Sequence, residues 1–417
     1  MFTTSSAGAL RAGAKTVCHN ASLQRRLFSV TSQRAGGFIV FKKGSNPELQ
    51  ERLDTLYNKI VLPSYLSKEQ QRKLTKTKYK EQLRNDPITM EIDGVIHKFR
   101  YVDPLKDIPS AYKLVKQAVI RMEHEDFHNL HLLLKGYKRA NRKLDQELTH
   151  KIIKKAWENG RLDAIIDCAK QVELTGFKLD TPLVLSELLV GLQTPAIESG
   201  FKAELLRKAL KETEKVIDLL EFEGKGHQPS ERSKTPRPFH HEPMFLGLRL
   251  NLAATLAVKH RDGQDVDGKV AQYAEQLVHF WPENTGILDL QPDAAYEDPL
   301  NVQYLLDRNN FLYHVSPVLH GLQMAAKVVD PGLSMKLQNR ADALENEIDQ
   351  AYNWPGRVRP EGERMYQWMF DTEGMVKRLR EQQKQVREAL ALKQKEEAAK
   401  KKGEGEAEVE AEAEATP

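Results

Sequence analysis

Apolar residues in the middle of this chain recur at intervals of three and four, which is the spacing of one face of an α-helix. Leu148 to Glu158 and Leu162 to Leu174 are predicted as two such helices, separated by the break Asn159-Gly160. Gly176 follows the second helix, where a helix end favours a left-handed residue. The pattern therefore predicts a helix pair over this segment.

The same pattern recurs at a distance of 35 residues. Lys143-Leu144-Asp145 is repeated as Lys178-Leu179-Asp180, and the apolar positions between residues 118 and 137 coincide with those between 153 and 172. A fixed period of this length is typical of stacked helix pairs, each of which buries its apolar face against the next. Such arrays are more often binding scaffolds than enzymes.

Residues 147 to 181 resemble a pentatricopeptide repeat. The resemblance lies in Asn159-Gly160-Arg161-Leu162-Asp163 at the turn and in Gly176-Phe177-Lys178-Leu179-Asp180 at the end. Residues 112 to 146 resemble a degenerate copy, and residues 182 to 216 a third, in which Pro195 falls at the turn. The resemblance implies an organellar RNA-binding protein in which each repeat reads one base with its fifth and last residues.

Carried over by position, the base-reading residues would be Lys151 with Thr181, and Lys116 with Gln146 in the copy before. The family usually has a small polar residue at the first place and Asp or Asn at the second, and neither pair follows this rule. The sequence therefore predicts a scaffold without base-specific reading. Lys116 and Lys151 are expected on a solvated helix face, with phosphate contact as the alternative.

Three further segments show distinct patterns. Alternating residues from Thr89 to Tyr101 around Asp93-Gly94 predict a β-hairpin. The segment between Glu223 and Pro243 is rich in Gly, Pro, Ser and His, which predicts a flexible loop that divides the array in two. Residues Glu361 to Lys402 predict a long charged helix whose apolar stripe is too sparse to bury much surface.

These patterns together predict an all-α fold, namely a solenoid of stacked helix pairs of pentatricopeptide or tetratricopeptide type. A small N-terminal β-hairpin and a long charged C-terminal helix complete it. The predicted segments are a transit peptide (1–34), an extension with a basic strip and the hairpin (35–109), the repeats (110–222), a flexible basic linker (223–243), a second region of helix pairs (244–354), the long charged helix (361–402) and a disordered acidic tail (403–417).

The N-terminal composition predicts targeting to mitochondria. No acidic residue precedes Glu48, and residues 1 to 34 carry five basic side chains among many Ser, Thr and Ala residues. This composition is typical of a mitochondrial transit peptide, with cleavage expected after Phe28 or Arg34. No apolar run reaches the roughly 18 residues of a membrane span. The expected location is the mitochondrial matrix.

Charge is unevenly distributed along the chain. Removal of residues 1 to 34 would change the formal net charge from +4 to −1, and the six glutamates of the tail leave +5 on residues 35 to 402. Basic side chains along an RNA backbone neutralise phosphates, and interleaved tyrosines such as Tyr65 and Tyr79 stack on bases. The candidate RNA-binding residues are Lys68, Arg72, Lys73, Lys76, Lys78, Lys80 and Arg84 in the basic strip, and Lys225, Arg232, Lys234 and Arg237 in the loop. For the strip, an ordinary charged surface helix is the alternative.

Catalytic and metal-binding motifs are missing from the sequence. It contains no glycine-rich phosphate loop, no Gly-x-Ser-x-Gly elbow and no paired cysteines, and Cys168 is expected to be a buried small hydrophobe. His227, His240, His241 and Glu242 are expected in an exposed polar loop, and His124, His128 and His131 in surface and packing roles. We therefore expect no enzymatic activity, cofactor, metal or small-molecule substrate.

The leading hypothesis is a structural component of the mitochondrial ribosome, with ribosomal RNA and neighbouring ribosomal proteins as partners. Basic extensions, a basic loop and degenerate repeats suit a surface that is fixed in an RNA–protein assembly, where shape and phosphate contacts carry the binding. The alternatives are a free factor for mitochondrial RNA maturation or translational activation, and an assembly factor for a respiratory complex.

Overall fold

The computed structural model describes residues 37–92, 94–222, 224–227, 229, 237–298, 301–352 and 360–370. Over these residues the protein is mostly helical, with one two-stranded sheet, which confirms the all-α prediction at that level. None of the described helices is long and apolar enough to cross a membrane. The predicted transit peptide, the acidic tail and the predicted charged helix beyond Phe370 lie outside the described residues.

The chain divides into two compact units, of which the smaller contains Leu66–Asp107. It comprises α2 (Lys68–Thr75), the 3₁₀ turn η3 (Thr77–Tyr79), α3 (Lys80–Asn85), β1 (Ile88–Ile92) and β2 (Val95–Phe99). Strand pairing from Ile88 with Phe99 to Ile92 with Val95 confirms the predicted hairpin, and Gly94 supplies the positive φ that its turn requires. The buried residues of this unit include Leu74, Leu83, Met90, Ile92 and Phe99.

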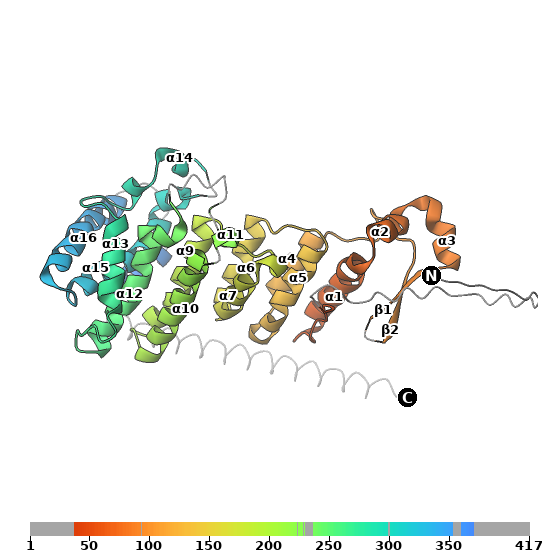
Figure 1. Ribbon diagram of the computed structural model, residues 1–417, viewed down its shortest axis with the longest axis horizontal. Helices are drawn as coiled ribbons and strands as arrows, with labels where there is room; N and C mark the ends of the chain where they lie inside the picture. The colour runs from red at the N-terminus through yellow and green to blue at the C-terminus, as the bar shows by residue number, and fades with distance from the viewer. Residues whose placement is uncertain are drawn as a thin grey trace, which may run out of the picture. The chain divides into compact units, whose positions relative to one another are not determined.

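The larger unit contains Ile39–Tyr65 and the chain from Ile108 onward. Its first helices are α1 (Pro47–Leu56), α4 (Ala111–Arg121), α5 (Leu130–Arg139), α6 (Gln146–Glu158), α7 (Leu162–Lys170), α8 (Val172–Thr175), α9 (Pro182–Glu198) and α10 (Ala203–Phe222). They are followed by α11 (Gly224–His227), α12 (Pro243–His260), α13 (Lys269–Phe280), α14 (Asp293–Tyr296), α15 (Arg308–Ala326), α16 (Pro331–Tyr352) and α17 (Pro360–Phe370). Within this unit, successive helix pairs lie side by side in a row from α4/α5 to α15/α16 (Figure 1).

Residues about 35 positions apart in the sequence contact each other in the first pairs. The Tyr112 hydroxyl donates to Glu147 Oε2 at 2.9 Å, and Lys138 Nζ donates to the Val172 carbonyl at 2.9 Å. Further along the row the spacing grows, since Asn251 Nδ2 donates to Gln193 Oε1 at 2.9 Å over 58 residues. The repeat in the sequence therefore corresponds to side-chain bonds between neighbouring helix pairs.

The helix pair predicted around residue 160 is confirmed. Its helices are α6 and α7/α8, and Gly176 closes α8 with the left-handed φ of 71°. Cys168 is completely buried in α7, and burial raises the pKa of its thiol, as expected for a residue that only fills space.

The turn predicted at Pro195 is wrong. Helix α9 continues through Pro195 to Glu198, and the chain turns at Gly200 and Phe201, which both have positive φ. Most of α9 is buried, including the apolar residues Leu185, Leu188, Leu189 and Ile197. Packing on several sides therefore keeps α9 helical past the proline, although Pro195 has no backbone N–H to donate.

The flexible linker predicted at 223–243 is wrong at both of its ends. His227, expected to be exposed, is 2% exposed: its Nδ1 accepts from the Leu179 amide and its Nε2 donates to the Ala169 carbonyl, each at 3.1 Å. At the other end, Phe239 is buried in the 3₁₀ turn η5 (Phe239–His241). The buried imidazole of His227 and the buried ring of Phe239 thus hold these ends against the array.

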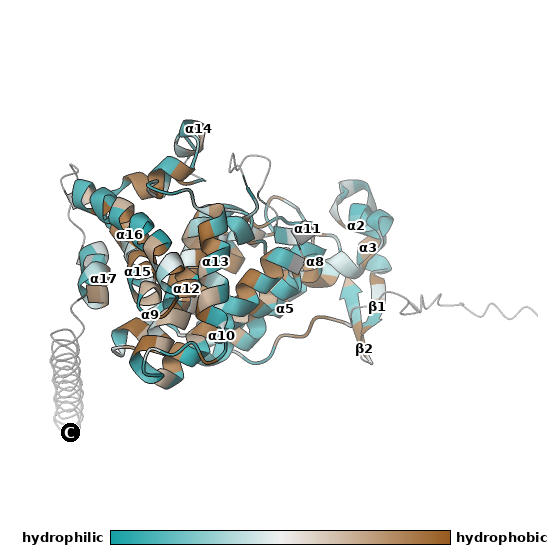
Figure 2. Ribbon diagram, turned by 60° about the vertical axis from the view of Figure 1, so that its left-hand side comes forward, coloured by the Kyte–Doolittle hydropathy of each residue, from teal (hydrophilic) through white to brown (hydrophobic). Residues whose placement is uncertain are grey.

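Helix α17 follows α16 in the sequence and packs against α15, the helix that precedes α16. The Gly362 amide donates to Asn309 Oδ1 at 2.7 Å, and Arg308 Nη2 lies 2.6 Å from Glu363 Oε1. Met365 and Met369 of this helix are buried and Tyr366 and Trp368 pack against the core; Figure 2 shows the helix beside α15. The first turns of the predicted charged helix are thus part of the folded unit.

Candidate functional site

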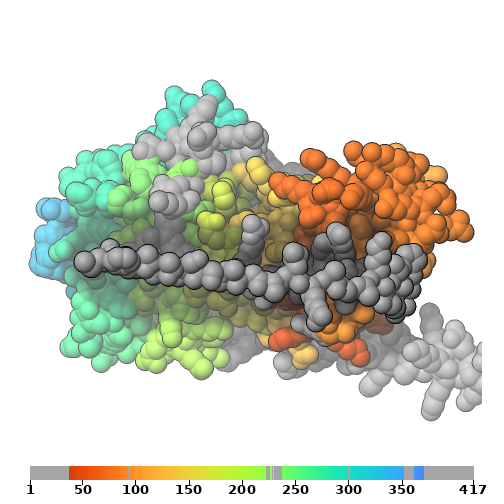
Figure 3. Space-filling view, turned by 45° about the vertical axis from the view of Figure 1, so that its right-hand side comes forward, coloured from red at the N-terminus to blue at the C-terminus, as the bar shows by residue number. Residues whose placement is uncertain are grey.

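The basic strip lies on α2, η3 and α3 of the smaller unit. Ser67 starts α2 with a capping box, since its hydroxyl accepts from the Gln70 amide and the Gln70 side chain accepts from the Ser67 amide. Leu74 and Leu83 are buried, which turns the polar sides of both helices to solvent. The exposed cations are Lys68, Arg72, Lys76, Lys78, Lys80 and Arg84, while Lys73 is half-buried. Figure 3 shows this unit as the orange surface.

The cations of the strip have few acidic partners. Among the described residues, only Lys73 forms an ion pair, with Nζ 3.0 Å from Glu69 Oε1. The other acidic residue within the strip, Glu81, is exposed and forms none. Such unpaired exposed lysines and arginines suit contact with an anionic polymer.

The two tyrosines near the strip, Tyr65 and Tyr79, are less exposed to solvent than the sequence suggested. Lys78 Nζ lies 4.8 Å from the Tyr79 ring centroid, and Tyr79 is half-buried. Tyr65 belongs to the larger unit, where its hydroxyl accepts from the Ile39 amide and the Arg139 guanidinium lies 3.8 Å from its ring. Arg139 therefore covers one face of the Tyr65 ring, which leaves only the other face for the predicted base stacking.

The loop candidates do not form a second basic cluster among the described residues. Lys225 belongs to α11, and Arg232 and Lys234 lie outside the residues that the structure describes. Arg237 is half-buried, and its Nη1 donates to the Phe280 carbonyl at 3.1 Å, at the end of α13. Across the described ranges, no three or more His, Cys, Asp or Glu side chains are placed to hold a metal ion.

Three of the four positions equivalent to base-reading residues are buried or paired within the protein. Thr181 is 3% exposed. Lys116 Nζ lies 3.5 Å from Glu147 Oε1, and Lys151 pairs with the same carboxylate. The bonds from Lys151 and Tyr112 and the nearby positive charges lower the pKa of Glu147 to about 2. Lys116 of α4 therefore links neighbouring helix pairs through Glu147 of α6, whereas Lys151 pairs with the same carboxylate within α6, and neither lysine is a free cation.

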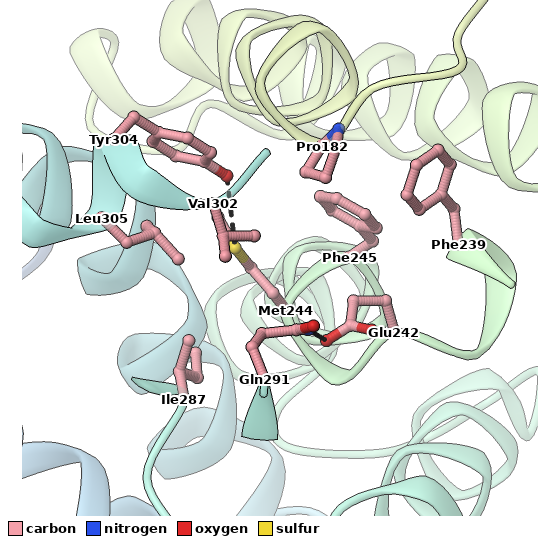
Figure 4. Close-up of a pocket in the computed structure, with 10 residues that line it drawn as sticks. All are labelled: Pro182, Phe239, Glu242, Met244, Phe245, Ile287, Gln291, Val302, Tyr304 and Leu305. Atoms are coloured by element: carbon pink, nitrogen blue, oxygen red, sulfur yellow. Dashed lines mark hydrogen bonds between the residues drawn. The ribbon is translucent and has the colours of Figure 1, made fainter. Parts of the chain in front are cut away.

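A second candidate site is a pocket in the larger unit, shown in Figure 4. Its space of about 320 Å³ includes the opening to solvent. The apolar or aromatic residues around it are Pro182, Phe239, Met244, Phe245, Ile287, Val302, Tyr304 and Leu305. Two polar side chains, Glu242 and Gln291, complete the lining. This pocket was not expected from the sequence, where Glu242 is predicted to lie in an exposed loop.

Glu242 is the polar centre of the pocket. It immediately precedes α12 but makes no side-chain bond to the free amides of that helix, and only 5% of its surface is exposed. Gln291 Nε2 donates to Glu242 Oε1 at 2.6 Å. Burial raises the pKa of Glu242 to about 7, outweighing the nearby charge of Arg237 and the bond from Gln291.

Glu242→Gln is expected to stabilise the isolated protein at pH 8, by about 1–2 kcal/mol, and to have little effect near pH 4.5. The folded protein favours the protonated carboxyl, so wild type loses stability as pH rises from the unfolded pKa toward about 7, and glutamine avoids this loss. Urea unfolding from pH 4.5 to 8 measures the difference. Glu81→Gln, at an exposed position, is the matched control. Equal effects of Glu242→Gln at both ends of the pH range would contradict the assignment.

Comparison with known proteins adds two findings. The model of a protein family described as mitochondrial ribosomal protein mS27 matches residues 26–371. The small ribosomal subunit protein mS27 of Neurospora crassa is 37% identical over 369 residues, which cover 82% of this chain and 93% of that protein. The family match includes the basic strip, all the helix pairs and the pocket.

Proposed function

Because the chain belongs to the family of mitochondrial ribosomal protein mS27, we propose that it is a structural protein of the small mitochondrial ribosomal subunit. The Neurospora relative is named as a protein of that subunit and shares most of its length with this chain. The role is architectural, the site of action is the matrix, and residues 1–34 are the targeting segment.

The helix pairs of the larger unit form a scaffold of pentatricopeptide or tetratricopeptide type. The bonds over 31 to 37 residues, from Lys116 to Glu147, from Lys138 to Val172 and from His150 to Glu187, support this assignment. In such an array each pair is stabilised mainly by its neighbours. The engaged Lys116 and Lys151 and the buried Thr181 favour a scaffold that holds its position in the particle without reading bases.

Ribosomal RNA is the partner of the basic strip. The observation that carries this assignment is the set of exposed cations on α2, η3 and α3 that have no ion pair among the described residues. Side chains of this kind contact phosphates and fix a protein on folded RNA without specifying sequence.

Sedimentation of mitochondrial lysates on a sucrose gradient tests the proposed function. The protein is expected to migrate with the small subunit and to remain there through a moderate-salt wash. A protein found only at the top of the gradient would contradict the proposal and favour a free RNA factor or an assembly factor.

The triple substitution of Lys76, Lys78 and Lys80 by glutamine is expected to weaken the salt dependence of binding to small-subunit RNA. Each lost phosphate contact removes about 0.7–0.9 from the slope of log K against log salt. Binding of the purified protein is measured over a series of salt concentrations. The control triple replaces exposed lysines of the larger unit, Lys178, Lys208 and Lys211. Equal slopes for the two triples would rule out a special role for the strip.

A further inference from the structure

The aromatic rings beside the basic strip are only partly accessible. Tyr79 and Tyr101 are half-buried, and Lys78 Nζ and Lys80 Nζ lie 4.8 and 5.6 Å from their respective ring centroids. Phe99, the remaining Phe, Tyr or Trp residue between positions 66 and 107, is buried. Proteins that bind single-stranded RNA stack its bases on exposed rings. The described residues of the smaller unit provide no such exposed ring.

The exposed cations of the strip form two short rows. Lys68 and Arg72 are four residues apart on α2, and Lys80 and Arg84 repeat this spacing on α3. Side chains four residues apart lie on the same side of a helix, with Cβ atoms about 5–6 Å from each other. Only Lys76 and η3 separate α2 from α3, so the two rows are close together (Figures 1 and 2). Two adjacent rows of cations suit the two phosphate backbones of a duplex.

Polar side chains that can contact ribose lie among these cations. Thr77 on η3 and Gln82 on α3 are exposed, and neither side chain is hydrogen-bonded to another described residue. The Thr77 hydroxyl and the Gln82 amide can each donate and accept a hydrogen bond, as can a ribose 2′-hydroxyl. Double-stranded RNA displays its 2′-hydroxyls along a wide and shallow minor groove. Cations with interspersed polar groups therefore match the surface of an RNA duplex.

We propose that the basic strip binds double-stranded segments of ribosomal RNA, with its cations on the phosphates and with Thr77 and Gln82 on 2′-hydroxyls. The inference rests on the proposed function for the choice of RNA as the partner. Binding of this kind follows the shape of the RNA helix and not its sequence. It requires a surface of fixed shape, which the capping box at Ser67 and the buried Leu74 and Leu83 provide.

Binding of the purified full-length protein to three labelled probes of one sequence tests the inference. The probes are an RNA duplex, the corresponding DNA duplex and the unpaired RNA strand, compared by fluorescence anisotropy at one salt concentration. We expect the RNA duplex to bind more tightly than the single strand, and about tenfold more tightly than the DNA duplex, which lacks the 2′-hydroxyls. Both preferences should disappear when Lys76, Lys78 and Lys80 are replaced by glutamine, which distinguishes the strip from other basic segments of the chain.

The double substitution Thr77→Val and Gln82→Met separates ribose contacts from charge. It should weaken binding to the RNA duplex about tenfold, while the affinity for the DNA duplex and the salt dependence stay the same. Gln117→Met, at an exposed position of α4, is the matched control and should change neither affinity. Equal or tighter binding of the single strand or the DNA duplex, or a preference for the RNA duplex that survives the double substitution, would overturn the inference. Failure to bind either RNA probe would instead contradict ribosomal RNA as the partner of the strip.

Discussion

Replacing Gly321 with valine is expected to lower the free energy of unfolding of the larger unit by about 3 kcal/mol or more. Gly321 lies on α15 where that helix crosses α12, and an added Cβ would lie 2.8 Å from Asn251 Cα and 2.9 Å from Asn251 N. Those are backbone atoms, so no rotamer change can relieve the clash. The two helices would have to separate.

Separation would also break a buried polar network. His320 Nδ1 lies 2.7 Å from Asn251 Oδ1, and Asn251 Nδ2 donates to Gln193 Oε1, which connects α15 and α12 to α9. All three side chains are at most 2% exposed, so bonds broken there are not replaced by water.

Urea unfolding followed by circular dichroism measures the effect of Gly321→Val. Gly332→Ala serves as the control, because Gly332 is exposed at the start of α16 and an added Cβ meets no backbone atom, only the carboxylate oxygen of Asp330 at 3.2 Å. An unchanged unfolding midpoint for Gly321→Val would show that α12 and α15 do not pack this closely in solution.

Arg340→Met is expected to destabilise the same unit by about 3 kcal/mol, because it leaves buried carbonyl groups without donors. Arg340, on α16, is 2% exposed. Its Nε donates to the Trp281 carbonyl at 2.7 Å, and its Nη2 donates to the Val278 carbonyl at 3.3 Å. One side chain thus binds the last turn of α13 and the residue that ends it.

Hydrogen exchange gives Arg340→Met a local readout. Amides from Val278 to Leu288 should lose protection first, because Glu347 of α16 binds the adjoining amides of Ile287 and Leu288 at 2.8 and 3.0 Å. Lys336→Met, at an exposed position on the same helix, is the matched control. Uniform loss of protection across the array would contradict a local clamp.

Features encoded by neighbouring residues were predictable from the sequence. The hairpin follows from the alternating residues around Asp93-Gly94, and the pair α6 and α7/α8 from its apolar spacing and Gly176. The 35-residue period was also informative, since contacts at that distance occur between α4 and α6. Each of these signals lies within one or two adjacent elements.

Features that depend on distant packing were not predictable. Pro195 remains helical because neighbouring helices bury α9 on several sides, and His227 is fixed by groups of α7 and the segment after α8. The pocket gathers residues from Pro182 to Leu305, which share no spacing in the sequence. A buried carboxylate such as Glu242 looks the same in the sequence as an exposed one.

The bonds between successive helix pairs span 35 residues at Tyr112 and Glu147, but 58 at Gln193 and Asn251. Each step still adds one pair to the row. The extra residues lie partly in longer helices, since α9 and α10 have 17 and 20 residues against 13 and 9 in α6 and α7, and partly in the connection between α10 and α12. The number of residues between two bonded positions therefore does not determine how many helix pairs separate them. Insertions and deletions at these connections can alter the surface offered to neighbouring molecules during evolution, while each helix pair keeps its bonds to the next.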